Sequence, residues 1–390
     1  MIMNNMILLS GFELNDNNRG SAALGYGAIA FLIEKGLYSA GDEFCVMSRM
    51  DKKFWKKRNF VSSTQVKVSN RFVNVKLIRY FDLEYKAYLK FGICFPLSPL
   101  GRLVKKLKFV AATNGGDGFS DIYSEPIFLN RLTESWMAMK EKKDLYLLPQ
   151  TMGPFVNSKL RKIADEILLY AKKIYVRDDK FVPELNKMGL SFEREKDLSA
   201  YMMPEPWAYD VKPNAVGINV SGLAYFNKFM TLSGHFEAYP LLVESLIKYF
   251  QKQGRPIYLI PHSYNYVKPE YANDDMIACK EVYRQLSDKS RIYVVDRDLT
   301  APQIKYVISK MSFFCGTRMH ANFAAIYTNV PVFGLAYSYK FAGAFESNGL
   351  SAEQTYMIDN MSIKEIPTVI SIIEDFYKKN VTLKEDGTND

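Results

Sequence analysis

The sequence predicts an α/β protein made of two doubly wound parallel sheets that face each other across a cleft. Short apolar runs without polar alternation recur along the 390 residues, as expected of strands buried on both faces. Segments with apolar residues at helical spacing separate these runs, so strand and helix alternate. The alternation stops once, in the proline-rich stretch 202–214, and then restarts. We therefore predict two successive α/β domains joined by a linker.

The first domain is predicted to cover residues 1–201. It opens with the strand "MILLSGF", which leads through a polar turn into a helix ending at Gly36, a residue suited to the position after a helix. The clearest helix begins at Ser158, where serine is a favourable cap and the apolar residues that follow share one face. The remaining strands are predicted at 44–47, 75–78, 109–114, 145–150 and 174–177.

The second domain is predicted to cover residues 215–350. One helix opens at Pro240 and ends before Gly254, the usual placement of these two residues at helix ends. Strands are predicted at 215–222, 256–263, 291–296, 312–317 and 330–337, and further helices near 275–287, 302–311 and 318–328. Residues 351–390 are expected to form a late helix at 362–379 and a frayed polar tail.

The charge balance favours anionic partners. The chain carries 51 Lys and Arg against 42 Asp and Glu, a net charge of +9, which suits anionic ligands or an acidic membrane surface without indicating nucleic acid. Basic residues gather at 52–58 and 102–109, and both clusters contain apolar side chains: Phe54, Trp55, Leu103, Val104 and Leu107. One interpretation of these clusters is a solvated face, and the other is a peripheral contact with a membrane.

Neither a metal site nor an exported location is expected. The four cysteines lie far apart inside apolar runs, as reduced core residues do: Cys45, Cys94, Cys279 and Cys315. No metal-binding motif such as HExxH, a zinc CxxC pair or an EF-hand loop occurs, so we expect no metal and no cofactor. The first residues lack the basic region of a signal peptide, and no later run is long enough to span a bilayer. A cytoplasmic protein is expected, with a position at the inner face of the membrane as an option.

Ligands of such folds bind at the carboxyl ends of the strands, so the loops there are the candidate sites. The segment "FFCGTRMHANFAAIYTN" places Gly316 and Thr317 at a strand end and Arg318 in the first helical turn. Unpaired N–H groups at a helix start favour a phosphate or carboxylate, and an arginine adds a bidentate donor. The sequence therefore predicts an anion pocket around Arg318.

His320 lies beside this pocket and has two interpretations. It could exchange a proton with a bound anion, or it could be a partly buried histidine that hydrogen bonds a backbone carbonyl. His262, in "IPHS", also ends a strand of the same domain and so favours the first interpretation. His235, in the looser "SGHFEAY", is interpreted as a surface residue.

A glycine-rich loop, "NGGDGFSDIYSE", follows a strand of the first domain. Its glycines, Gly116 among them, allow the backbone to approach a ligand closely. Asp117 and Asp121 could bind sugar hydroxyls or act as a general base, or they could simply cap the turn. The loop lacks the spacing of a dinucleotide site or a P-loop. Arg177, at the end of another strand, could reach a ligand anion or form an ion pair with Asp178.

These segments resemble the polysaccharide pyruvyl transferase family, whose members move pyruvate from phosphoenolpyruvate onto sugar hydroxyls as a ketal. The resemblance covers roughly residues 10 to 345 and follows the family order through "NRGSAAL", "NGGDGFSDIY", "LPQTMGPF", "YVRDDKFVPEL", "IPHS", "CGTRMHA" and "PVFGLAYSYK". It implies an architecture similar to that of two-domain GT-B glycosyltransferases, with a carboxy-terminal donor domain and an amino-terminal acceptor domain.

The resemblance implies a role for each candidate residue. Phosphoenolpyruvate would be bound by Arg318, Arg177, Gly316, Thr317 and His262. His320 would be the general acid or stabilise the departing phosphate, and Asp121 would orient or deprotonate a sugar hydroxyl. Asp117, Gly116 and Asn18 would bind the acceptor, a saccharide for which a lipid-linked precursor is one option.

The chain departs from the family pattern at three places. Ser21 stands where the family usually has an aspartate, so no acidic role is assigned to the amino-terminal loop. Asn114 replaces the first of three common glycines, and Phe181 stands where a serine often follows the Arg-Asp pair. Two other classes of protein share the predicted architecture. One is a nucleotide-sugar glycosyltransferase that binds a diphosphate at Arg318, and the other is a non-catalytic carbohydrate-binding or assembly protein.

Overall fold

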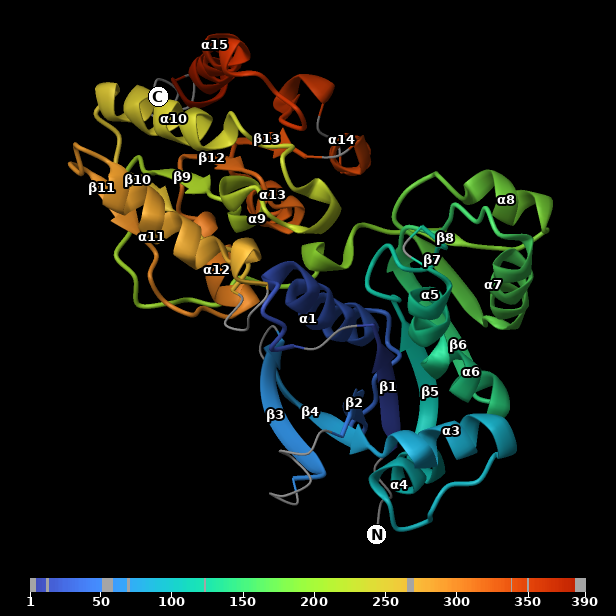
Figure 1. Cartoon of the computed structure of the whole chain (residues 1–390). Coiled ribbons are helices and arrows are strands. Elements are labelled where there is room, and N and C mark those ends of the chain that lie inside the picture. Colours follow the sequence, from blue (N-terminus) through green and yellow to red (C-terminus); the bar gives the residue numbers. More distant parts are fainter. Residues whose placement is uncertain are drawn as a thin grey trace, which may run out of the picture. The chain divides into compact units, whose positions relative to one another are not determined.

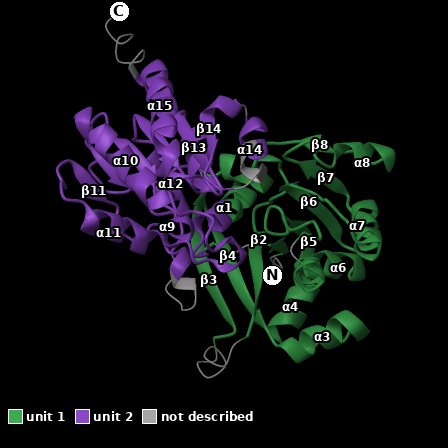
Figure 2. Cartoon of the chain, turned by 45° about the horizontal axis from the view of Figure 1, so that its top comes forward, with its two compact units in different colours: residues 1–14, 24–202 green, residues 15–23, 203–390 purple. Residues whose placement is uncertain are grey.

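The chain divides into two compact units (Figure 2). The computed structural model describes residues 5–11, 14–50, 59–68, 71–122, 124–264, 270–337, 339–348 and 351–382. The first unit consists of Met1–Leu14 and Leu24–Met202, and the second of Asn15–Ala23 and Met203–Asp390. Residues 15–23 were predicted to belong to the first domain, but they group with the second unit.

Among the described residues of the first unit, eight strands form a sheet in the order β3-β4-β2-β1-β5-β6-β7-β8 (Figure 1). All neighbours in this sheet are parallel except β3 and β4. The strands are β1 (Met6–Ser10), β2 (Glu43–Arg49), β3 (Val61–Val68), β4 (Arg71–Tyr80), β5 (Leu107–Ala112), β6 (Asp144–Gln150), β7 (Lys173–Val176) and β8 (Glu193–Arg194). Strands β3 and β8, at the two edges, were not predicted. Most of β3 is exposed, so it lacks the apolar run of a strand buried on both faces.

Helices cover both faces of this sheet. Successive residues of β1 alternate between two cores: Ile7 and Leu9 pack with α1, and Met6 and Leu8 pack with α4, α6 and α7. The helices are α1 (Arg19–Glu34), α3 (Asp82–Phe91), α4 (Pro99–Lys106), α5 (Glu125–Arg131), α6 (Thr133–Lys140), α7 (Ser158–Tyr170) and α8 (Val182–Lys187). The first unit is therefore doubly wound, as predicted.

The described strands of the second unit form a six-stranded parallel sheet in the order β11-β10-β9-β12-β13-β14. Counted within the unit, this is the Rossmann order 3-2-1-4-5-6. The strands are β9 (Val216–Asn219), β10 (Ile257–Leu259), β11 (Ile292–Val294), β12 (Phe313–Gly316), β13 (Val332–Ala336) and β14 (Thr355–Met357). Strand β14, whose three residues are only half-buried, was not predicted.

The helices of the second unit also lie on both faces of their sheet. Val216 and Ile218 pack with α10, α11 and α15, while Tyr258 and Phe314 pack with α12 and α13. The helices are α9 (Gly222–Phe226), α10 (Tyr239–Lys252), α11 (Asp275–Gln285), α12 (Ala301–Ile308), α13 (Met319–Ile326), α14 (Tyr339–Glu346) and α15 (Ile366–Tyr377). The late helix expected at 362–379 is thus α15, and it contributes to the core of the second unit.

The direction of winding reverses once in each sheet. The reversal falls between β1 and β5 in the first unit and between β9 and β12 in the second. In sheets of this kind, ligands bind beside the carboxyl ends of the two strands at which the winding reverses. In the first unit the two loops touch: Gly11 has φ +98, and a Cβ on it would lie 2.5 Å from the backbone nitrogen of Gly115. Each unit therefore places its predicted loops at such a reversal.

Two of the apolar residues predicted to contact a membrane are buried in the structure. Leu103 and Leu107 are buried in the core of the first unit, so they cannot enter a lipid surface. The cluster 52–58, with Phe54 and Trp55, lies outside the described residues. Within the described part of the chain, none of the helices combines the length and apolar character needed to cross a bilayer.

Candidate functional site

The carboxylate of Asp275 holds together the loops at the carboxyl edge of the second sheet. Asp275 is the first residue of α11 and is fully buried. Its Oδ1 accepts a hydrogen bond from the N–H of Gly222, at 2.8 Å, in the loop after β9. Its Oδ2 accepts from the N–H groups of His262 and Ser263, each at 3.1 Å, in the loop after β10. One side chain thus fixes two neighbouring loops.

Asp275 also forms a buried ion pair with Arg318. Nη2 of Arg318 lies 2.7 Å from Oδ1, and Nε lies 3.2 Å from both carboxylate oxygens. Nη2 donates in addition to the side-chain and main-chain oxygens of Asn273, at 2.6 and 3.1 Å. Burial acts to lower the pKa of Arg318, but the charge and hydrogen bonds of Asp275 raise it above its ordinary value. Arg318 is therefore a permanent cation in this site.

Asn219 orients the turn between β12 and α13. Its Oδ1 accepts from the N–H groups of Thr317 and Arg318, at 3.3 and 2.8 Å. The hydroxyl of Thr317 lies 2.7 Å from that of Tyr239. Gly316 precedes this turn, and a Cβ there would collide with the side chain of Asn322. These contacts fix the start of α13, where an anion would be met by N–H groups from Met319 onward.

The segment 15–23 lies against the histidines of this edge. The N–H of Arg19 donates to the carbonyl of His262 at 3.0 Å, and Asn18 forms a β-bridge with Ser263. The guanidinium of Arg19 is anchored by an ion pair with Asp298 and by a 2.7 Å hydrogen bond to the carbonyl of Leu299. The start of α1 is thereby part of the second unit's site.

His320 is half-buried and packs on this segment. A Cβ added to Gly20 would lie 2.6 Å from Nδ1 of His320 and 2.9 Å from its Cγ. Only glycine at this position leaves room for the imidazole in its observed place. The Nε2 atom of the ring is also shielded from solvent. His320 is therefore held between its own helix α13 and the first turn of α1.

His262 is a neutral residue at the same edge. Its side chain is buried, and burial lowers the pKa of His262 well below the ordinary value. The charges of His320, Arg318 and Arg19 act in the same direction. His262 therefore contributes an uncharged imidazole rather than a proton at neutral pH.

The glycine-rich loop forms the corresponding edge of the first sheet. Asn114, Gly115 and Gly116 all have left-handed backbones, with φ of 49, 79 and 86°. The side chain of Asn114 donates to Gln150 at 3.2 Å, and the carbonyl of Gly116 accepts from the N–H of Thr151 at 2.9 Å. Asparagine is one of the few other residues that tolerate this conformation, which explains how it replaces a glycine here.

Arg177 lies next to this loop. A Cβ on Gly116 would be 3.5 Å from Nη1 of Arg177, and Nη1 is paired with the buried Asp197 at 2.6 Å. Nε donates to the hydroxyl of Thr151 at 3.1 Å. Burial acts to lower the pKa of Arg177, but neighbouring carboxylates, Asp197 foremost, raise it. The ion pair thus involves Asp197, while Asp178 hydrogen bonds to Thr151.

The two aspartates of the glycine-rich loop differ in their contacts. Oδ2 of Asp121 accepts from the N–H groups of Val156 and Asn157, both at 2.7 Å, so this carboxylate caps the loop before α7. Asp117 is half-buried, and its charge contributes to the raised pKa of Arg177. The predicted acceptor residues Gly116, Asp117 and Asp121 therefore lie on one loop of the first unit.

The structure gathers the predicted residues into two sets, one in each unit. The first unit holds Arg177, Gly116, Asp117 and Asp121, and the second holds Asn18, His262, Gly316, Thr317, Arg318 and His320. Asn18 was expected beside the acceptor residues but lies against Ser263 in the second unit. Three residues that hold these sets together were not predicted from the sequence: Asp275, Asn219 and Asp197. Asn219 ends a predicted strand and could have been found by the carboxyl-edge rule.

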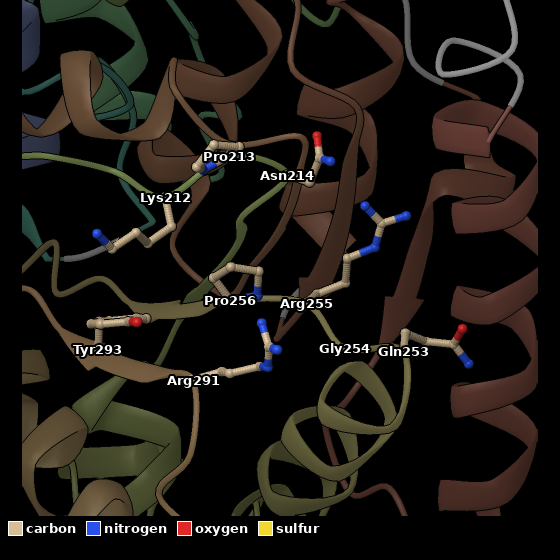
Figure 3. A pocket seen from close by; sticks show the side chains of 9 residues that line it. All are labelled: Lys212, Pro213, Asn214, Gln253, Gly254, Arg255, Pro256, Arg291 and Tyr293. Atoms are coloured by element: carbon tan, nitrogen blue, oxygen red, sulfur yellow. The ribbon is translucent and has the colours of Figure 1, made fainter.

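One pocket lies at the opposite, amino-terminal edge of the second sheet (Figure 3). Its volume is about 400 Å³, and its walls come from the segments that precede β9, β10 and β11. It is lined by Lys212, Pro213, Asn214, Gln253, Gly254, Arg255, Pro256, Arg291 and Tyr293. Three of these residues are basic, so the pocket offers a second place where an anion could bind, away from the residues around Arg318.

Comparison with known proteins identifies one family and a common fold. The model of a family described as polysaccharide pyruvyl transferase matches residues 18–339. The amylovoran biosynthesis protein AmsJ of Erwinia amylovora is 18% identical over 283 residues, which are 68% of this chain, and the match spans 66% of AmsJ.

Solved structures support the fold. The UDP-GlcNAc 2-epimerase of Methanocaldococcus jannaschii has a TM-score of 0.53 at 11% identity, with coverage of 95% of this chain and 92% of the epimerase. Anabaena HepE, solved in complex with UDP and glucose, has a TM-score of 0.50 at 9% identity, with coverage of 97% and 92%. This likeness confirms the predicted GT-B-like fold of two Rossmann-like domains.

We expect Asp275→Asn to lower the thermal unfolding midpoint strongly. The substitution leaves the buried Arg318 without its counter-charge, a change that typically costs about 3–5 kcal/mol. Adding Arg318→Gln should recover part of the loss, because the uncompensated charge is then gone. The control is Glu281→Gln on the same helix, which breaks an exposed ion pair with Arg284 and should change the midpoint little. Equal midpoints for Asp275→Asn and Glu281→Gln would contradict the central role of Asp275.

We also expect a pH-dependent part of the stability to disappear in His262→Gln. Below the unfolded pKa of about 6.5, the unfolded chain binds a proton at His262 that the native state does not. This contribution to stability is therefore present at neutral pH and is lost as the pH falls below about 6.5. The thermal unfolding midpoint is measured at pH 7.5 and at pH 5.5, about one unit above and one unit below that pKa. The difference between the two midpoints should be smaller in His262→Gln than in the wild type. An unchanged difference in His262→Gln would show that the pKa of His262 is not lowered in the native state.

Proposed function

Because the chain belongs to the polysaccharide pyruvyl transferase family, we propose that it moves a pyruvyl group from phosphoenolpyruvate onto two hydroxyls of one sugar. The product is a cyclic ketal, and phosphate is released. The observation that carries this proposal is the arrangement at the start of α13, where a buried cation and a histidine lie within three residues of each other on a fixed helix end. Such a pairing of anion recognition with a proton donor is what phosphoenolpyruvate chemistry requires.

Donor binding is assigned to the edge around Arg318. The contacts of its guanidinium with described residues use Nε and Nη2, so Nη1 can donate to a ligand anion. The N-terminus of α13, Gly316 and Thr317 would meet a second anionic group. Neutral His262 would accept or donate a hydrogen bond without adding charge. Arg177, a cation of the first unit, is assigned to the donor as well.

The reaction needs one proton delivered to carbon. Protonation of the methylene of phosphoenolpyruvate makes it a methyl group and leaves the adjacent carbon electrophilic. One sugar hydroxyl then attacks that carbon, the bond to the phosphate oxygen breaks, and a second hydroxyl closes the ring. The two hydroxyls lose two protons: one replaces the proton given to the methylene, and the other ends on the released phosphate as hydrogen phosphate. We assign His320 as the acid in this sequence.

Acceptor binding is assigned to the glycine-rich loop. The left-handed backbones of Gly115 and Gly116 allow a sugar to approach the main chain, and Asp117 could accept hydrogen bonds from its hydroxyls. Asp121 is assigned the orienting or deprotonating role through its Oδ1, because Oδ2 already caps the loop before α7. The acceptor is a saccharide, and a lipid-linked precursor at the inner face of the membrane is part of this proposal.

A nucleotide-sugar glycosyltransferase is the second candidate. It is favoured by the GT-B-like fold alone, since that fold also carries nucleotide chemistry. In a glycosyltransferase, Arg318 would bind the diphosphate of the nucleotide sugar. Ligand preference separates the two functions.

We expect saturable binding of phosphoenolpyruvate in a calorimetric titration, and weaker binding of UDP, CMP and GDP. Arg318→Lys keeps a charge but removes the Nη1 donor assigned to the ligand, so it should weaken phosphoenolpyruvate binding by at least about tenfold. The control is Arg291→Gln, which alters the pocket at the other edge of the sheet and should leave the affinity unchanged.

Tighter binding of a nucleotide than of phosphoenolpyruvate would move the assignment to a glycosyltransferase. Loss of phosphoenolpyruvate binding in Arg291→Gln, but not in Arg318→Lys, would place the donor in the pocket of Figure 3 instead.

We expect His320→Ala to lose turnover by about 10²–10⁴-fold while keeping most of its affinity for phosphoenolpyruvate. The turnover measured is phosphate release from phosphoenolpyruvate in the presence of a saccharide extract from cells that carry the gene. His235→Ala, which removes a half-exposed histidine paired with Asp359, should keep full activity. Full activity in His320→Ala would remove this histidine from the mechanism.

A further inference from the structure

The segment from α3 to α4 exposes an unusual concentration of large apolar side chains. Five of them lie within fifteen residues and range from 64% exposed for Ile93 to 83% for Leu83: Leu83, Phe91, Ile93, Phe95 and Leu97. Nine large apolar residues in the described part of the chain are at least 64% exposed, and five of the nine fall in this one segment. Single exposed apolar residues are ordinary, but a group of this size marks an interaction site.

These exposed side chains are distinct from the core, because the same two helices bury other apolar residues. Tyr85 and Tyr88 of α3 and Leu100 and Leu103 of α4 are buried in the first unit. On α3, helical spacing puts Leu83 on the outer face, away from the buried tyrosines. The exposed residues thus form a second apolar surface that the folded chain does not use.

The loop between the two helices is held in a fixed shape. The buried carboxylate of Glu84 accepts hydrogen bonds from the N–H of Phe95, at 2.8 Å, and from the hydroxyl of Ser98. Ser98 also caps α4 by accepting from the N–H of Gly101 at 2.9 Å. Gly101 approaches the carbonyl of Phe95 so closely that a Cβ there would collide with it. Phe95 and Leu97 therefore lie on a loop that hydrogen bonds hold in one conformation. A fixed loop loses less conformational entropy when its side chains bind a partner.

The two helices that flank this apolar surface carry basic side chains. Lys90 lies over the ring of Phe91, with Nζ 5.0 Å from the ring centroid, and Lys86 lies on the outer face of α3. Arg102 and Lys105 are exposed on α4, and Lys106 is half-exposed beside them. Apolar groups ringed by lysine and arginine are typical of proteins that lie on anionic bilayers.

We propose that the α3–α4 segment, residues 82–106, docks on the surface of an anionic lipid bilayer. Phe91, Ile93, Phe95 and Leu97 enter the boundary between head groups and acyl chains, and the basic side chains contact lipid phosphates. The surface replaces the one expected from Leu103 and Leu107, which are buried. This inference goes beyond the proposed reaction and does not depend on its donor or acceptor.

Charge favours a bilayer over a second copy of the chain as the occupant. In a two-fold symmetric dimer the same surface meets itself, so the lysines and arginines around it would face one another. Like charges placed across an interface repel. An anionic bilayer offers both an apolar layer and opposite charge.

The test is co-sedimentation of the full chain with phosphatidylcholine vesicles, with and without phosphatidylglycerol, in the absence of phosphoenolpyruvate and saccharide. We expect binding only with phosphatidylglycerol, and weaker binding as the salt concentration rises from about 0.05 to about 0.5 M. Phe95→Ser combined with Leu97→Ser should raise the apparent dissociation constant about tenfold or more, because two inserted side chains are lost. Arg102→Gln combined with Lys105→Gln should remove the preference for phosphatidylglycerol.

Matched controls change equally exposed residues elsewhere in the first unit. Val156→Ser with Leu169→Ser replaces two apolar side chains that are 88% and 64% exposed, and Lys180→Gln with Lys187→Gln replaces two exposed lysines. Both controls should bind vesicles as the wild type does. Unchanged binding by the Phe95, Leu97 variant would overturn the proposal. A wild type that dimerises through this surface in sedimentation equilibrium, and becomes monomeric in that variant, would overturn it in favour of self-association.

Discussion

The ion pair between Asp275 and Arg318 is the constraint on which the second unit's site depends. A carboxylate without solvent must have its charge balanced and its lone pairs occupied. Asp275 meets both needs with Arg318 and with the main-chain N–H groups of Gly222, His262 and Ser263. The same bonds fix the loops that follow β9, β10 and β12, which are three adjacent strands of the sheet. The electrostatic requirement of one buried group thus determines the geometry of the whole edge.

The two units satisfy this requirement in parallel ways. In the first unit Arg177 pairs with the buried Asp197, which also caps the turn that begins at Leu198. In the second unit Arg318 pairs with Asp275, at the start of a helix. Each sheet therefore carries at its carboxyl edge an arginine that is paired with a buried aspartate, and neighbouring carboxylates raise the pKa of each arginine. The adjacent His262 is kept neutral, so charge at these edges is concentrated on the arginines.

The sequence predicts the fold well where strands are buried and poorly where they are not. Continuous apolar runs predicted β1, β6, β12 and β13. Strand β3 is polar and mostly exposed, so its sequence has no such run. It is a strand because it pairs with β4. For the candidate site, the carboxyl-edge rule selected Arg318 and His320, and the structure places both at that edge of the second sheet. It missed Asp275, because an aspartate at a helix start usually caps that helix, and here Asp274 does so instead. The partners of Asp275 lie up to 56 residues away, and no local pattern reveals them.

The position of residues 15–23 has a consequence for how the chain can be made and divided. This segment is synthesised near the beginning, yet its partners at His262, Asp298 and His320 come hundreds of residues later. Domains generally form in order as the chain leaves the ribosome, so the first turn of α1 must wait until most of the second unit has been translated. Cutting the chain at residue 202 would likewise not give two complete halves. A separately expressed carboxy-terminal half would lack Arg19, and with it one anchor of the carboxyl edge of its own sheet.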